Sequence, residues 1–217
     1  MKPHISVCIP VYQGASTLAA TLRSVLASER ADFEVVVRDN GSTDGTSDVI
    51  AGFDDPRIRH IRSEKTLPLP ANWRATVEQA HGELIKVVCA DDLIRPECLA
   101  SQAALLEDPT VALVACRRDF IDGNGDVLTR NAGLPGLLGR HGVSEVARVA
   151  VRFGINPVGE PACVMFRRRD YDAIGGFDGT IVFAMDIDAW LRILTRGDMI
   201  GQPEAHAAFR MWTESFS

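Results

Sequence analysis

The sequence lacks a long apolar run. Nowhere do about 18 apolar residues follow one another, the length that indicates a transmembrane helix. The N-terminal stretch is interrupted by Pro3 and Pro10, and it also lacks the apolar core of a secretory signal peptide. We therefore predict a chain without a signal peptide or a transmembrane segment. We expect it in the cytoplasm, where peripheral contact with the inner face of the membrane remains open to it.

Cysteine is scarce, and basic residues are not clustered. The 5 cysteines form no Cys-x-x-Cys pair and are odd in number, which favours free buried thiols in a reducing compartment over a disulfide framework or a zinc site. The formal net charge is -6, and the longest basic run is the triplet Arg167–Arg169. This balance argues against nucleic acid as a partner. It also means that an anionic ligand needs a cation or a helix N-terminus to bind.

The chain does carry an alternation of strand-like and helix-like segments. Apolar and β-branched stretches predict strands over residues 4–11, 33–37 and 58–61, within 83–92, and over 111–116. Helical spacing predicts helices over 16–29, around Val49 and Ile50, over 72–81 and over 96–107. This order predicts an α/β fold with a mostly parallel, doubly wound sheet.

The pattern changes after residue 116. Residues 122–125 carry a hairpin-type turn signal, and residues 131–142 lack a clear period, which indicates a loop. A helix is predicted over 143–153, a strand over 162–166 and an amphipathic helix over 186–195. We expect a first portion, residues 1–117, and a second portion, residues 118–217, of one domain.

The strand-like run within residues 83–92 ends in Asp91 and Asp92. The carboxyl end of a strand in an open α/β sheet borders the ligand crevice. Two adjacent carboxylates there repel each other and gain most by sharing a hard divalent cation such as Mg²⁺ or Mn²⁺. The alternative is that Asp92 begins the helix at Pro96 as a cap.

Two earlier loops also follow strands. Tyr12 lies after the first strand, where an aromatic ring either fills the core or stacks on a nucleobase. Asp39 closes the second strand, at a position suited to accept a hydrogen bond from a base or a ribose. The small residues 42–46 that follow suit a capped turn with close backbone approach.

Five segments in order resemble the inverting glycosyltransferases of family 2, which have the GT-A fold: SVCIPVYQG, VVVRDNGSTDGT, GELIKVVCADDLIRP, GGFD and MDIDAWLRIL. The resemblance spans nearly the whole chain. It implies that residues 1–117 bind a nucleotide-diphosphate sugar, and that residues 118–217 bind the acceptor and carry the catalytic base. It also implies Mn²⁺ or Mg²⁺ as cofactor, and a saccharide or lipid-linked acceptor as the second substrate.

Roles are carried over position by position. Tyr12 resembles the base-stacking aromatic residue, Asp39 the base-reading carboxylate and Asp91 the metal ligand. Asp186 resembles the general base. The remaining positions implied by the resemblance are nucleotide-binding Pro10 and Ala90, and Gly176, Phe177, Asp178 and Arg192 on the acceptor side.

The chain departs from the family pattern at three positions. Cys89 stands where the family has a ribose-contacting Asp, Met185 where it has the Glu before the base, and Trp212 where it often has a metal-binding His. Asp186 and Asp188 also open a helix, so either is a candidate cap, and Asp188 suits the structural role better.

Three functions remain open from the sequence. The first is inverting sugar transfer for cell-surface polysaccharide or glycoconjugate synthesis. The second is a non-catalytic nucleotide- or saccharide-binding module, which the three departures favour. The third is nucleotidyl transfer to a sugar phosphate, which wants a cationic Gly-rich loop after the first strand, and residues 10–16 contain no cation.

Overall fold

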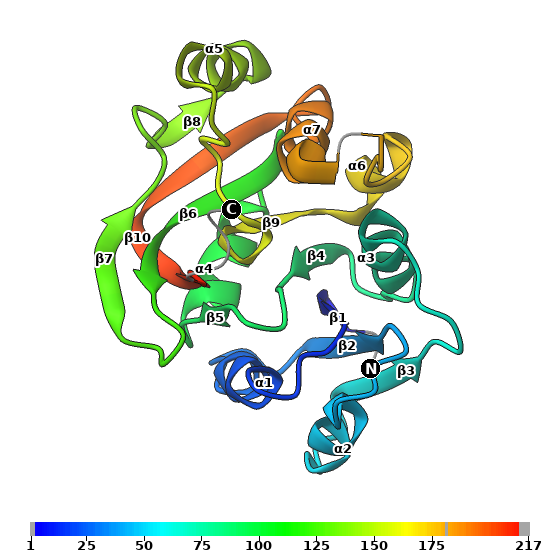
Figure 1. Ribbon diagram of the computed structural model, residues 1–217. Helices are drawn as coiled ribbons and strands as arrows, with labels where there is room; N and C mark the ends of the chain where they lie inside the picture. Colours follow the sequence, from blue (N-terminus) through cyan, green and yellow to red (C-terminus); the bar gives the residue numbers. More distant parts are fainter. Residues whose placement is uncertain (1–2, 181, 213–217) are drawn as a thin grey trace.

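A computed structural model describes residues 3–180 and 182–212, and Figure 1 shows their arrangement. A single twisted sheet runs through the molecule in the order β3-β2-β1-β4-β9-β6-β10-β5, and β7 and β8 pair with β6 and β10. Helices cover the sheet and connect its strands. Strands β1 to β4 build one end of this sheet, and strands β5 to β10 build the other (Figure 1).

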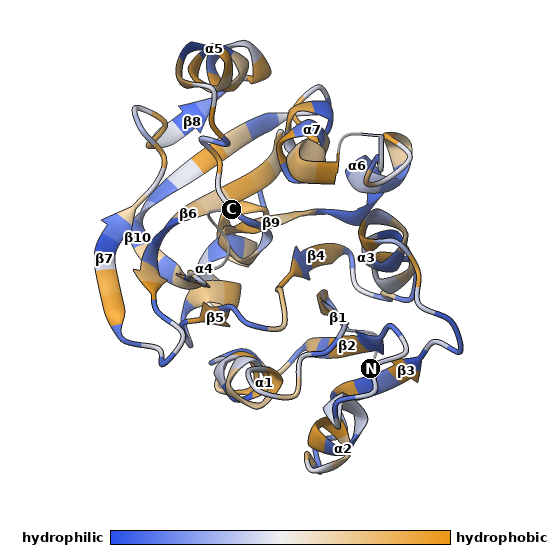
Figure 2. Ribbon diagram, viewed as in Figure 1, coloured by the Kyte–Doolittle hydropathy of each residue, from blue (hydrophilic) through white to orange (hydrophobic). Residues whose placement is uncertain are grey.

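The first end of the sheet is parallel, as expected. β1 (Ile5–Val11) pairs with β2 (Phe33–Asp39) and β4 (Leu84–Val87), and β2 pairs with β3 (Ile58–Arg62). The residues of β1, β2 and β4 are all buried, which explains their near-continuous apolar sequence (Figure 2). The connecting helices are α1 (Leu18–Leu26), α2 (Thr46–Ala51) and α3 (Leu69–Glu78).

The second end is mixed. β9 (Val164–Arg167) is antiparallel to both β4 and β6 (Val111–Ile121), and β6 is parallel to β10 (Asp198–Arg210). β5 (Leu93–Ile94) and β8 (Gly139–His141) pair antiparallel with β10, and β7 (Val127–Ala132) forms the expected hairpin with β6. The α/β fold class is therefore confirmed, with a continuous parallel run in β3-β2-β1-β4 and one further parallel pair, β6 and β10.

The remaining helices are α4 (Cys98–Leu105), α5 (Val143–Phe153), α6 (Arg168–Ala173) and α7 (Met185–Ile193), with short 3-10 turns η1 (Pro161–Cys163) and η2 (Val182–Ala184). The boundary expected between residues 117 and 118 lies inside β6, so the two portions share a strand. Among the described helices, none is long and apolar enough to cross a membrane.

Three strands, β5, β8 and β10, and the helix α6 escaped the sequence analysis, and β10 is the longest of them. It contains Gly201 and Pro203, residues that normally interrupt a strand. Its pairing with β6 shifts register between Gln202 and Ala205, so Pro203 lies in an irregularity that needs no ladder hydrogen bond from it. The strand forms because both neighbours, β6 and β8, supply partners for its other residues.

Candidate functional site

A cavity of about 600 Å³ opens where β1 and β4 end. Its wall contains four of the five residues that the sequence assigns to the nucleotide: Pro10, Tyr12, Ala90 and Asp91. Tyr12 is 54% exposed, so its ring lies on the surface of the cavity and does not fill the core. The other lining residues include Gln13, Gly14, Asn40, Thr66, Leu67, Leu69, Asn72, Trp73, Cys89 and Trp212.

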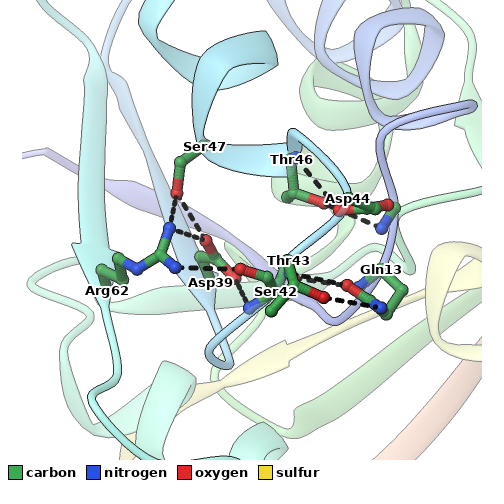
Figure 3. A network of polar contacts seen from close by, with 9 residues as sticks. Gln13, Asp39, Ser42, Thr43, Asp44, Thr46, Ser47 and Arg62 are labelled. Carbon is green, nitrogen blue, oxygen red and sulfur yellow. Dashed lines mark hydrogen bonds and ion pairs between the residues drawn. The ribbon is translucent and has the colours of Figure 1, made fainter.

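The loop after β1 is held in an unusual conformation. Gln13 has a φ of 53°, a left-handed value that is uncommon for a residue with a side chain. Its backbone N–H donates to Ser42 Oγ, and its amide oxygen accepts from the Thr43 N–H at 2.8 Å (Figure 3). Gly14 follows, and a Cβ there would lie 2.5 Å from Val11. The two loops after β1 and β2 therefore fix each other.

Asp39 does not line the cavity. Its carboxylate is fully buried and accepts hydrogen bonds from the Ser42 N–H, the Ser47 hydroxyl and Arg62 (Figure 3). Burial opposes ionisation, but the bonds from Ser47 and Ser42 and the charge of Arg62 hold the pKa of Asp39 below its usual range. Its observed contacts hold the loop after β2, and Asn40 is the neighbouring residue on the cavity wall.

Asp91 and Asp92 face in different directions. Asp91 lines the cavity, and its Oδ2 accepts a hydrogen bond of 2.9 Å from the indole N–H of Trp212. Asp92 is fully buried and accepts from the Arg210 N–H. Burial and then the charge of Asp91 raise the pKa of Asp92 well above its usual value. Asp91 is therefore the carboxylate of this pair that offers an oxygen to the cavity, whereas Asp92 is buried in the core.

Asp186 begins α7 and is partly buried. Its Oδ2 accepts a hydrogen bond of 2.8 Å from the Asn156 side-chain amide, and its Oδ1 accepts from the Ile187 N–H. Burial raises the pKa of Asp186, against the lowering effect of these bonds. The N-cap of α7 is Ala184, without a side-chain cap bond, whereas Asp188 forms an ion pair with Arg192 one turn later.

One further acidic group, Glu160, escaped the sequence analysis as a site residue. Glu160 is held by a two-pronged ion pair with Arg118, and burial raises its pKa, with the charge of Asp186 acting in the same direction. The pKa of Cys89 is raised by burial and then by the charges of Asp92, Asp91, Asp186 and Glu160. The donor-side and α7 carboxylates therefore lie close enough to act on one thiol.

The model of the family described as Glycosyl transferase family 2 matches residues 6–175. This chain belongs to that family. A protein of Mycobacterium tuberculosis described only as uncharacterised is 36% identical over 203 residues, which cover 90% of this chain and 63% of that protein. The putative glycosyltransferase EpsE of Bacillus subtilis is 28% identical over 90% of this chain and 68% of its own length.

Solved structures agree on the fold. TarS of S. aureus has a TM-score of 0.75 at 18% identity, over 97% of this chain and 60% of TarS. The mannosyltransferase PcManGT of Pyrobaculum calidifontis, solved with GDP-Man and Mn²⁺, has a TM-score of 0.72 at 20% identity, over 96% of this chain and 57% of PcManGT. The fold is therefore the GT-A fold of family 2 glycosyltransferases. The chain spans about 60% of the length of these solved chains.

The residues around Asp91 fit a family-type divalent cation with one protein carboxylate. Mg²⁺ is often bound by one or two carboxylates together with substrate phosphates. Among the described residues, Asp91 Oδ1 has no hydrogen-bond partner, and no group of three acidic, His or Cys side chains is arranged to hold a metal. The raised pKa of Cys89 keeps it a neutral thiol, which is a poor ligand for a hard cation. The donor's phosphates would therefore have to complete the shell.

Three of the four positions assigned to the acceptor side, residues 176–178, lie in one turn before α7, and Arg192 lies in α7 itself. Gly176 has a φ of 77°, and a Cβ there would lie 2.9 Å from the Tyr171 hydroxyl. Phe177 is fully buried, and Asp178 accepts from the Thr180 N–H. Arg192 donates to the carbonyl oxygens of residues 174 and 176. The contacts of Phe177 and Arg192 hold this turn against α7, and their contact with an acceptor stays a prediction.

Proposed function

We propose that this protein is an inverting glycosyltransferase that moves a sugar from a nucleotide-diphosphate donor to an acceptor hydroxyl. The observation that carries the proposal is Asp186, a partly buried carboxylate with a raised pKa whose charge, like those of Asp91 and Asp92, raises the pKa of Cys89 on the cavity wall. A general base works best when its pKa approaches the operating pH. Succinoglycan biosynthesis protein ExoO, 33% identical over 45% of this chain, supports polysaccharide or glycoconjugate synthesis as the setting.

In the proposed step, Asp186 takes the proton of the acceptor hydroxyl. The acceptor oxygen then uses its electron pair to form a bond to C1 of the sugar, from the face opposite the diphosphate. The C1–oxygen bond to the diphosphate breaks, and its electron pair leaves with the nucleotide diphosphate. Proton removal by a positioned base contributes about 10²–10⁴ to the rate, and the configuration at C1 inverts.

The donor half of the proposal assigns binding to the cavity. Tyr12 stacks on the nucleobase, Asp39 or its neighbour Asn40 selects the base, and Asp91 would hold Mn²⁺ or Mg²⁺ against the diphosphate. When bound, such a cation neutralises charge on the leaving group. The exposed ring of Tyr12 and the open oxygen of Asp91 support these assignments. TarS was solved with UDP-GlcNAc and PcManGT with GDP-Man, so uridine and guanosine donors are the first to test.

The test is release of nucleotide diphosphate from UDP-GlcNAc and from GDP-mannose, with water as acceptor, with and without Mn²⁺. Release that stops in Asp186→Asn supports the transferase. Proton NMR of the released sugar then reads the configuration at C1 before mutarotation, and retention would contradict the inverting mechanism.

A non-catalytic binding module is the second candidate, because the Trp212 indole already occupies one oxygen of Asp91. It predicts that a nucleotide diphosphate raises the melting temperature by mass action while no donor is cleaved.

A further inference from the structure

We propose that Asn156 is a positioning residue for the general base: its side-chain amide fixes Asp186 from outside α7 and keeps it in the charged form that accepts a proton. The inference rests on the proposed function of Asp186. It concerns a residue that no motif of the sequence marked, 30 positions away along the chain.

The Asn156 side chain uses both of its ends. Its oxygen accepts the backbone N–H groups of Val158 and Gly159, each at 3.1 Å, and so closes a tight turn. Its amide nitrogen donates to the Gly159 carbonyl at 2.9 Å and to Asp186 Oδ2 at 2.8 Å. The turn thus orients the amide, and the amide orients the carboxylate.

The turn is itself anchored to α7. The indole N–H of Trp190 donates to the Gly159 carbonyl at 3.1 Å, and Trp190 is fully buried. Gly159 has a φ of 114°, and a Cβ there would lie 3.2 Å from Cys163. Asn156 is therefore held by the same helix whose first turn carries Asp186. The distance between amide and carboxylate is fixed by packing.

The hydrogen bond from Asn156 to Asp186 matters because the other charged groups around Asp186 are acidic or already paired. Glu160 and Asp91 are acidic, and Asp186 and Asp91 both act on the buried Cys89 thiol. Glu160 is balanced by its ion pair with Arg118, and Asp188 by Arg192. Among the described residues, no Lys or Arg donates to Asp186. Within residues 3–180 and 182–212, Asn156 is the only side chain that donates a hydrogen bond to Asp186.

The number of oxygen lone pairs left on Asp186 decides whether it can still accept a proton from a substrate. A carboxylate has about four acceptor sites, of which Asn156 and the Ile187 N–H use two, so oxygen lone pairs remain for a substrate proton. Donation to the charged form lowers a carboxyl pKa, whereas burial raises it. Asn156 thus limits the rise in the Asp186 pKa that burial causes and favours the ionised carboxylate.

Two variants separate positioning from turn formation. Asn156→Asp keeps the oxygen that accepts the Val158 and Gly159 N–H groups, but replaces the donor to Asp186 with a second carboxylate. Asn156→Ser keeps a shorter acceptor for the turn and removes the donor without adding charge. Melting temperatures identify which variants fold. If Asn156→Asp does not fold, Asn156→Ser alone is sufficient to test the inference.

The measured quantity is the pKa of Asp186 itself. It is determined by ¹³C NMR titration of the full chain with labelled Asp carboxyl groups. Its resonance is identified by its loss in Asp186→Asn. We expect the pKa to rise in Asn156→Ser and to rise further, by at least about 1, in Asn156→Asp. The resonance of Asp188 serves as the internal control and should stay in place because Arg192 holds it. An unchanged Asp186 pKa in a folded Asn156→Ser protein overturns the inference.

Donor hydrolysis then connects the shift to the reaction. The acid limb of the pH–rate profile should move to higher pH in Asn156→Ser by the same amount as the NMR titration, with donor KM unchanged. An NMR shift without a matching kinetic shift would leave Asn156 as a partner of Asp186 while removing Asp186 as the base. Failure of the inference and failure of the proposed function are thus distinguishable.

Discussion

The proposed donor side and the proposed acceptor side of this site are built in different ways. On the proposed donor side, Tyr12 follows β1 directly and Asp91 lies shortly after the end of β4, and the sheet brings the strand ends together. On the acceptor side, Asp186 is positioned by a side-chain hydrogen bond from a loop that belongs to no strand or helix. A sheet edge positions residues through the backbone, whereas the acceptor side depends on particular side chains.

The carboxylates of Asp39 and Asp186 show how these two kinds of environment affect a pKa. Asp39 accepts three hydrogen bonds, one from a cation, and its pKa is lowered. In the part of the chain that the structure describes, Asp186 accepts hydrogen bonds only from neutral donors, and burial raises its pKa. The first environment suits a permanent anion that organises a loop, and the second suits a group that gains and loses a proton.

The largest expected effect lies on the acceptor side. Asp186→Asn should lower donor cleavage by about 10²–10⁴ because the basic oxygen is lost, while donor affinity and melting temperature barely change. In the wild type, activity should fall as pH falls through the raised pKa of Asp186, since only the ionised carboxylate accepts a proton. Steady-state rates between pH 4 and 9 check both. Near-normal turnover in Asp186→Asn would return the residue to a structural role.

On the donor side, Asp91→Asn should remove the dependence of nucleotide binding on Mn²⁺. We expect the free energy of UDP binding in the presence of Mn²⁺ to become less favourable by about 1.5–3 kcal/mol, the range for hydrogen bonds to a charged group. Calorimetric titration of UDP with and without Mn²⁺ measures it. Trp212→His is the converse variant, because it offers an imidazole beside Asp91 and should strengthen Mn²⁺ binding in the presence of UDP. If metal dependence persists in Asp91→Asn, the ligand assignment is wrong.

Tyr12→Ala should weaken binding of UDP by about 1–3 kcal/mol, the value of stacking a base on an aromatic ring. Tyr12→Phe is the matched control and should bind normally, because it keeps the ring and removes only the hydroxyl. Calorimetry distinguishes the two. Equal losses in both variants would assign the effect to the hydroxyl group and not to stacking.

The smallest effect concerns the loop after β2. Arg62→Ala should cost less than about 1 kcal/mol of stability, because the Arg62 side chain is 51% exposed and such ion pairs contribute little. The same variant uncovers Asp39, so affinity for UDP relative to GDP should change if Asp39 reads the base. Urea unfolding and calorimetry measure the two quantities. Unchanged base preference in both Arg62→Ala and Asp39→Asn would leave Asp39 as a loop anchor only.

Local sequence was sufficient to predict the strands at the parallel end of the sheet. Buried β-branched runs, capped turns and glycines define β1, β2 and β4 without reference to the rest of the chain. The same signals placed Tyr12 and Asp91 beside a crevice, since the carboxyl ends of parallel strands meet at one edge. The strand β10 was not predictable in this way, because its Pro203 is tolerated only through a register shift against β6.

The sequence by itself determined which residues have suitable chemistry, and the family motifs placed them in order. Only the tertiary structure decided which of these groups carry a free oxygen. Asp92 lies in the core, Asp39 accepts hydrogen bonds from Ser42, Ser47 and Arg62, and Asp91 accepts one from Trp212, 121 residues away. Hydrogen-bond saturation and burial depend on contacts between distant segments, so no local pattern encodes the pKa of Asp186 or its bond to Asn156.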